Sequence, residues 1–155
     1  MIKTWYQSPI GMLNIVSDGK SLTELKFGEP KEKTNNQDLL IFKETCRWLD
    51  LYFSGKKPNF TPPLNPQGTP FQQIVWQELL RIPYGETTTY GAIAKRINCR
   101  SAQAVGQAIH RNPIAIIIPC HRVIGADGSL TGYASGLDIK RKLLQMEENP
   151  IFAQK

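Results

Sequence analysis

The chain has 155 residues, of which 41% are hydrophobic and 9% aromatic, enough to bury one or two small cores without metals or disulfides. Nineteen Lys and Arg against thirteen Asp and Glu give a net charge of +6. That charge suits a polyanionic partner or simple solubility, and by itself it does not separate the two. No run of apolar residues approaches the length of a membrane span.

The three cysteines, Cys46, Cys99 and Cys120, are widely separated and form no paired motif with histidines. This spacing argues against a disulfide framework and against a zinc site, so we expect neither a metal nor another cofactor. The first residues lack a basic flank leading into an apolar core. We therefore expect a soluble, cytoplasmic protein with no membrane partner.

The first part of the chain predicts a small sheet followed by a helix. Residues 2–27 alternate apolar and polar side chains between turn signals, which predicts two or three antiparallel strands. Residues 38–53 carry apolar side chains at helical spacing, with Asp38 as the expected cap and Gly55 as the end. Cys46 lies on the apolar stripe, so we interpret it as a packing residue.

A proline-rich stretch divides the chain. Residues 56–69 contain four prolines and few periodic apolar side chains, which is typical of an extended linker. We therefore predict an N-terminal α/β domain, residues 1–65 including this linker, and a C-terminal domain, residues 66–155. Thr69-Pro70 is a strong start signal for the next helix.

Two short helices are predicted next, at residues 88–97 and 101–111. Small residues on both allow close packing, which favours a helix-turn-helix. Between Thr88 and Arg122 there is no acidic residue, and the basic residues are Lys95, Arg96, Arg100, Arg111 and Arg122. This bias favours a phosphate backbone as partner, although an ordinary helical hairpin with a solvated basic side remains an alternative.

The apolar run 114–118 is predicted to be a buried strand that ends in Pro119-Cys120-His121-Arg122. A thiol needs deprotonation to become a nucleophile, and His121 could supply the base, through a bridging water if the segment is extended. An acid at the end of a helix predicted at 137–146, Glu147 or Glu148, could hold the other ring nitrogen. The alternative is a buried cysteine beside a structural histidine.

These residues resemble a known family from about Thr69 to Glu148, the O6-alkylguanine-DNA alkyltransferases, also called methylated-DNA-protein-cysteine methyltransferases. The resemblance rests on the segment Ile118 to Val123, IPCHRV, with Asn-Pro before it and Thr-Gly-Tyr, Lys140 and Glu147 after it. The N-terminal part matches in layout. The resemblance implies an α/β (α+β) protein with a small antiparallel sheet and helix of ribonuclease H-like type, followed by a helical, winged helix-turn-helix-like domain.

The resemblance also implies roles for individual residues. Cys120 would accept the alkyl group, His121 would deprotonate it through a water, and Glu147 would orient His121. Asn112 would tie the helix-turn-helix to the cysteine loop, and Tyr133 would help guanine leave by hydrogen-bonding to its N3. The backbone of three pocket residues would read the base: the carbonyls of Cys120 and Val123 and the amide of Ala134.

The implied partner is double-stranded DNA that contains O6-alkylguanine, with O4-alkylthymine left open. The helix 101–111 would enter the minor groove while the damaged base is flipped out, and transfer would be irreversible and occur once per molecule. The family's usual finger arginine is replaced here by Gln103, which can still hydrogen-bond an orphaned cytosine. A monomer is expected, with cooperative binding left open. The implied DNA contacts are Tyr90, Arg100, Ser101, Gln103, Ala104, Gly106, Arg111 and Arg122.

Three rival functions are weighed against this one. Non-catalytic relatives that only bind alkylated DNA lack the acceptor cysteine, whereas this chain has Cys120. A DNA-binding regulator would leave His121, Tyr133 and Glu147 without a role. A thiol hydrolase would turn over rather than react once.

Overall fold

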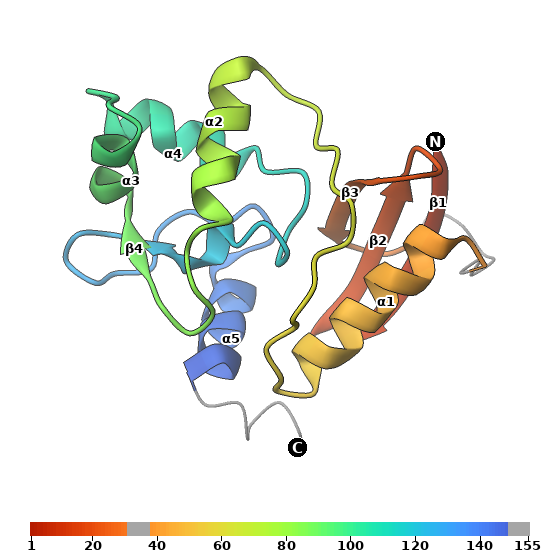
Figure 1. Ribbon diagram of the computed structural model, residues 1–155. Helices are drawn as coiled ribbons and strands as arrows, with labels where there is room; N and C mark the ends of the chain where they lie inside the picture. The colour runs from red at the N-terminus through yellow and green to blue at the C-terminus, as the bar shows by residue number, and fades with distance from the viewer. Residues whose placement is uncertain (31–37, 149–155) are drawn as a thin grey trace.

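The computed structural model describes residues 1–30 and 38–148. The N-terminal part is a three-stranded antiparallel sheet in the order β1 (Ile2–Ser8), β2 (Gly11–Ser17), β3 (Leu22–Phe27). Helix α1 (Leu40–Phe53) lies across one face of this sheet (Figure 1). The predicted small sheet followed by a helix is therefore confirmed.

The start of α1 differs from its prediction. Its N-cap is Leu39, which is extended and makes no side-chain cap, so the expectation that Asp38 caps this helix is wrong. Leu39 packs against the hydrophobic core. At the other end Gly55 has a positive φ of 84°, as a helix-ending glycine requires.

The outer edge of β3 is covered by two later segments. The amide of Leu22 donates to the carbonyl of Pro63 in the linker at 2.8 Å. Leu25 pairs with the segment before Cys120: its amide donates to Pro113 O at 2.9 Å, and its carbonyl accepts from Ala115 N at 2.8 Å. Edge strands left open invite unwanted pairing, so these bonds both close the sheet and tie the two parts of the chain together.

The C-terminal part is mainly helical, and among the residues that the structure describes no helix is long and apolar enough to cross a membrane. Trp76 Nε1 donates to Ala108 O at 2.9 Å and so locks the first helix of this part onto the helix-turn-helix. The elements are α2 (Pro70–Leu79), β4 (Thr88–Thr89), α3 (Tyr90–Arg96), α4 (Ala102–His110), a 3-10 helix (Cys120–Arg122), β5 (Val123–Ile124) and α5 (Leu137–Glu148).

Helix boundaries follow their caps. Thr69 accepts from Gln72 N at 3.1 Å and Gln72 reaches back to Thr69 N at 2.9 Å, so the predicted start of α2 is confirmed as a capping box. Helix α3 begins two residues later than predicted because Thr88 and Thr89 pair with β5 in a short parallel ladder. Helix α5 runs two residues further than predicted and so includes Glu147.

Residues 114–118 are buried as predicted, but the expected strand is wrong. Ile114 makes a single bridge to β3, and the chain then turns, with Ile117 N donating to Ala115 O at 2.8 Å around Ile116. Ile116 has a positive φ of 70°, which is rare for a β-branched residue. A second three-residue turn around Pro119 leads into the 3-10 helix. These local bonds satisfy the backbone without a neighbouring strand.

We expect Thr69→Ala to lower the free energy of unfolding by about 1 kcal/mol, because the first turn of α2 loses its side-chain acceptor. Urea unfolding followed by circular dichroism measures the change. Thr61→Ala, at an exposed threonine of the linker, is the matched control. Equal midpoints for the two variants would contradict the stabilising role of the capping box.

Candidate active site

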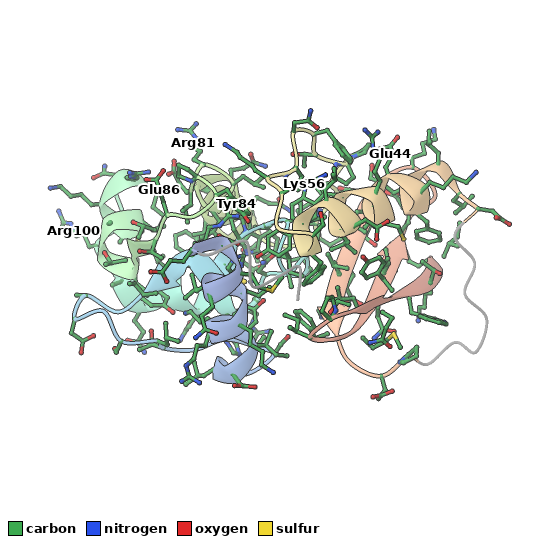
Figure 2. The ribbon with its side chains drawn as sticks, turned by 90° about the horizontal axis from the view of Figure 1, so that it is seen from below. Glu44, Lys56, Arg81, Tyr84, Glu86 and Arg100 are labelled. Atoms are coloured by element: carbon green, nitrogen blue, oxygen red, sulfur yellow. The ribbon has the colours of Figure 1, made fainter. Side chains whose placement is uncertain are left out.

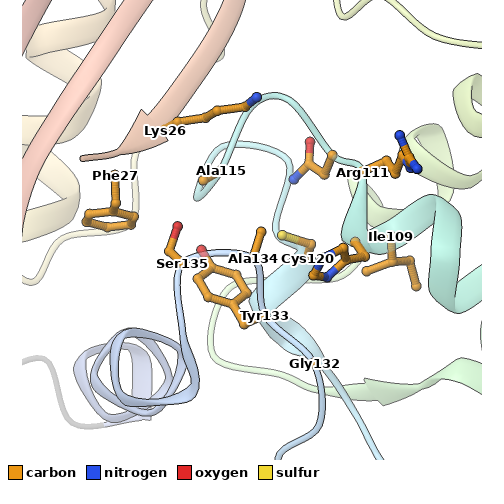
Figure 3. A pocket seen from close by; sticks show the side chains of 12 residues that line it. Lys26, Phe27, Ile109, Arg111, Ala115, Cys120, Gly132, Tyr133, Ala134 and Ser135 are labelled. Atoms are coloured by element: carbon orange, nitrogen blue, oxygen red, sulfur yellow. The ribbon is translucent and has the colours of Figure 1, made fainter. Parts of the chain in front are cut away.

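Cys120 lines a pocket of about 540 Å³ that both parts of the chain form. The sulfur-bearing side chain is 8% exposed. Tyr133, Ala134 and Ser135, from the segment before α5, form one wall, and the end of β3 contributes Lys26 and Phe27 to the other (Figure 3). The pocket therefore places a thiol beside a tyrosine in a largely buried setting.

Asn112 holds the loop that carries Cys120. This residue follows the C-cap of α4, and its Nδ2 donates to Ile114 O at 3.2 Å and to Ile118 O at 2.8 Å. Its Oδ1 accepts from Ile114 N at 3.0 Å. Asn112 thus lies between the helix-turn-helix and the cysteine loop, the position that the family resemblance implies.

His121 is fully buried beside Cys120 in the 3-10 helix, so the extended segment assumed from the sequence is corrected here. Its Nε2 lies 2.5 Å from Glu147 Oε2. Its Nδ1 is buried with no hydrogen-bond partner among the described residues. Nε2 of the His121 ring therefore contacts the carboxylate, and Nδ1 is available to accept or donate a proton.

Glu147, rather than Glu148, is the acid that meets His121, since Glu147 is buried and Glu148 is exposed. Its two oxygens also accept hydrogen bonds from Arg122 Nε at 2.7 Å and from Tyr52 Oη of α1 at 2.6 Å. The amide of Gly85 donates to it at 3.3 Å. A buried carboxylate with this many donors is both oriented and stabilised in its charged form.

The pKa values fix the resting protonation of the site. Burial alone would raise the pKa of Glu147, but the hydrogen bonds and charges of His121 and Arg122 lower it to about 2. Burial lowers the pKa of His121, against the opposing effect of Glu147. Burial raises the pKa of Cys120, although Asn112 and Lys140 act in the opposite direction. The site thus rests as neutral thiol, neutral imidazole and ionised carboxylate, and the thiol needs a base to react.

Arg122 is buried rather than on the basic surface, so its position does not support the predicted DNA contact, which stays a prediction. Nε and Nη2 donate to Glu147 at 2.7 and 3.2 Å, and Nη1 donates to Ile82 O at 2.8 Å. The guanidinium also lies 5.7 Å from the centre of the Tyr84 ring. A buried carboxylate attracts the nearest guanidinium, so this arginine is held inside the protein.

Lys140 lies close to the site, although no role was predicted for it. It is 0% exposed, and its Nζ donates to Val123 O at 2.6 Å and to Thr131 O at 2.7 Å. Its charge also favours the thiolate of Cys120. Two charged residues, Lys140 and Glu147, lie among the buried residues of α5, where apolar side chains are expected. This break in the apolar pattern is the sequence signal that could have identified Lys140.

Tyr133 and Ala134 line the pocket together with Cys120, whereas Val123, the third predicted base-reading residue, is fully buried and is not among the lining residues. The Tyr133 hydroxyl is buried with no hydrogen-bond partner among the described residues, and burial raises the pKa of Tyr133 well above its ordinary value. Tyr133 therefore remains a hydrogen-bond donor. Ala134 is exposed in the pocket wall. The carbonyl of Val123 accepts from Lys140 Nζ at 2.6 Å.

A groove of about 750 Å³ runs along α4, and four of the other predicted DNA contacts line it: Tyr90, Gln103, Gly106 and Arg111. A Cβ at Gly106 would meet Tyr90 at an ordinary 3.7 Å, so internal packing does not require this glycine. The Tyr90 hydroxyl donates to Thr131 O at 3.0 Å. The groove therefore allows close approach from outside.

Basic and polar side chains stand at the ends of α4. Arg100 projects outward from the α3–α4 end of the molecule (Figure 2), and Arg111 is exposed at the C-cap of α4. Ser101 and Gln103 are exposed, and Ala104 is half-buried. Ser101 also caps the helix by accepting from Ala104 N at 3.1 Å.

Comparison with known proteins identifies the family. The model of the 6-O-methylguanine DNA methyltransferase DNA-binding domain matches residues 70–149, and that of its ribonuclease-like domain matches residues 1–66. The chain is 51% identical over 148 residues to a methylated-DNA–protein-cysteine methyltransferase of Methanosarcina acetivorans, covering 92% of this chain and 95% of that protein. A Haemophilus influenzae protein of the same name is 47% identical over 154 residues, covering 95% and 86%.

A solved structure of the same family has the same fold. Mycobacterium tuberculosis OGT in complex with DNA superposes with a TM-score of 0.85 and 47% sequence identity, covering 94% of this chain and 92% of that one. The α/β arrangement of small sheet, helix and helical C-terminal part is thereby confirmed. The chain belongs to the 6-O-methylguanine DNA methyltransferase family.

Proposed function

We propose that this protein repairs double-stranded DNA directly, by moving the alkyl group of O6-alkylguanine onto Cys120, once per molecule. The observation that carries the proposal is the buried Cys120 thiol next to a His121–Glu147 pair, in a pocket that also presents the Tyr133 hydroxyl. The names of the relatives, methylated-DNA–protein-cysteine methyltransferases, support the same reaction.

The proposed step begins with removal of the Cys120 proton, through a water, to Nδ1 of His121. The thiolate attacks the alkyl carbon, so a sulfur–carbon bond forms and the bond from carbon to O6 of guanine breaks. The electron pair of the broken bond stays on guanine, which then takes up a proton. Tyr133 would stabilise the leaving base by donating a hydrogen bond to N3, and ionised Glu147 would stabilise protonated His121.

The product would be a thioether, in which sulfur is a poor leaving group toward water at neutral pH. No step would regenerate the thiol, so each molecule would act once. This stoichiometry distinguishes the proposal from a thiol hydrolase, which would release its product and turn over.

Access to the base would require flipping it from the duplex, at a cost of a few kcal/mol. In the proposed complex α4 enters the minor groove with its small residues Ala104 and Gly106 toward the DNA. Tyr90 presses on the phosphate of the target nucleotide, and Gln103 occupies the space left by the base. Arg100, Ser101 and Arg111 contact the backbone.

The flipped base would be read in the pocket by the carbonyls of Cys120 and Val123 and by the amide of Ala134. The exposed position of Ala134 in the pocket wall supports its assignment. We include in the proposal a monomer in the cytoplasm, with domains at residues 1–65 and 66–155.

The central test incubates the protein with duplex DNA that carries radiolabelled O6-methylguanine and locates the label by peptide mass. We expect label on the peptide of Cys120, saturating at one group per protein, and none in Cys120→Ala. Cys99→Ala, at the half-buried cysteine of the helix-turn-helix, is the matched control and should take up label fully. Binding without label transfer would instead indicate a damage-recognition protein.

A second test concerns Gln103. We expect Gln103→Arg to keep or raise the rate of transfer from duplex DNA, because arginine has a longer reach and a charge to occupy the space of the flipped base. Single-turnover rates on duplex and single-stranded substrates measure the effect. Gln77→Arg, which adds the same charge at an exposed position of α2, serves as control. A large loss in Gln103→Arg alone would show that the position is wrongly assigned.

A third test uses pH. Neutral His121 is the proposed base, and burial holds its pKa below the ordinary value of 6.5. The transfer rate should therefore be full above this lowered pKa and fall only as the pH drops through it, with the acid limb below pH 6.5. Glu147 stays ionised throughout, because its pKa is about 2. Rates at saturating duplex DNA measure the profile, and an acid limb above pH 6.5 would contradict the assignment.

A further inference from the structure

One side chain of the N-terminal part reaches the acceptor machinery directly. Tyr52 lies in the last turn of α1, and its Oη donates to Glu147 Oε2 at 2.6 Å across 95 positions of sequence. Tyr52 is 1% exposed and Glu147 4% exposed, so this bond is shielded from solvent. A hydrogen bond to a buried charge is among the stronger ones in a protein.

The Tyr52 ring is fixed on several sides. It stacks on Trp48 with ring centres 5.3 Å apart and planes 9° apart. The rings of Phe53 and Tyr84 meet it edge-on, at 5.2 and 6.2 Å. Tyr84 lies between α2 and α3 in the chain, so both parts of the protein hold the ring (Figure 2). The position of the hydroxyl is therefore determined by packing and not by the hydrogen bond alone.

Tyr52 and His121 share one oxygen of Glu147. His121 Nε2 and Tyr52 Oη both lie against Oε2, while Oε1 accepts from Arg122 Nε and Gly85 N. With its donors arriving from several directions, the carboxylate cannot rotate without losing bonds. The orientation of the His121 ring depends on that of Oε2, and with the proton on Nε2 the lone pair stays on Nδ1.

We propose that Tyr52 is a positioning residue for the alkyl transfer: by donating to Glu147 Oε2 it fixes the carboxylate that holds His121 with Nδ1 ready to take the Cys120 proton. This inference rests on the proposed function. It gives the N-terminal part a defined contribution to the reaction, although Tyr52 itself is not one of the residues that line the Cys120 pocket.

Removal of the hydroxyl has a predictable electrostatic result. The carboxylate of Glu147 would lose one donor, and its interaction with protonated His121 would strengthen, which raises the pKa of His121. Because neutral His121 is the base, the acid limb of the transfer rate would move to higher pH. The other charged or titratable groups around this pair, which stay in place, are Arg122, Tyr84, Tyr133, Cys120 and Lys140.

The experiment compares Tyr52→Phe with Tyr6→Phe. Tyr6 Oη donates to Asp50 Oδ1 at 2.5 Å, so the control also removes a tyrosine–carboxylate hydrogen bond to α1 but leaves Glu147 untouched. We expect the single-turnover rate of Tyr52→Phe to fall about tenfold, the effect of losing one hydrogen bond to a charged group. Its acid limb should move to higher pH, while DNA affinity stays that of the parent. Tyr6→Phe should keep the parent rate and profile.

A second measurement does not need the reaction. Only His110 and His121 carry imidazole rings, so nitrogen NMR with His110→Gln as the background reports His121 alone. The parent should show the proton on Nε2, and in Tyr52→Phe the His121 ring should become doubly protonated at a higher pH while the amide spectrum remains folded.

The outcomes separate the two proposals. A parent protein that transfers no label refutes the proposed function. A parent that transfers label, with Tyr52→Phe matching it in rate, in acid limb and in the pH at which His121 is protonated, overturns only the role of Tyr52. Equal losses in Tyr52→Phe and Tyr6→Phe without a shift of the acid limb would likewise overturn it, because they would reflect a general loosening of α1.

Discussion

The ionised carboxylate of Glu147 is the group on which the rest of the site depends. Among the described residues it accepts from His121 Nε2, Tyr52 Oη, Gly85 N and both Nε and Nη2 of Arg122. A charge buried this deeply costs several kcal/mol unless its partners are in place. These donors come from α1, from the connection after α2 and from the 3-10 helix, so the charge is stable only when all three segments have met.

The acceptor loop is the second constraint, and it is held from both sides. Its backbone turns tightly at Ile116, where φ is 70°, and again at Pro119. Strained backbone persists only where its surroundings fix it. Here Asn112 fixes the loop from the helix-turn-helix, and Leu25 of β3 fixes it by two backbone hydrogen bonds from the N-terminal sheet. The position of Cys120 is thus a joint product of the two parts.

The sequence predicted those features that are determined by residues close together in the chain. The capping box at Thr69 and the helix-turn-helix were predictable because caps, periodicity and small residues act within a few positions. Cys120 and His121 were visible as a local pair, and the family resemblance supplied Glu147. The 114–118 strand was wrong because apolar β-branched composition reports burial and not the presence of a pairing partner. Arg122 and Tyr52 depend on contacts with Glu147 from distant segments, which no local pattern encodes.

The basic residues of this chain consequently do two different kinds of work. Arg122 and Lys140 are buried, and their charges act on Glu147, on backbone carbonyls and on Cys120, where salt screens them little. Lys95, Arg96, Arg100 and Arg111 are exposed around α3 and α4, where their attraction for phosphates is weakened by salt. The net charge of the chain does not distinguish the buried basic residues from the exposed ones. Burial separates them: the first set lies beside Cys120 and Glu147, and the second set is open to the phosphate backbone of the proposed DNA partner.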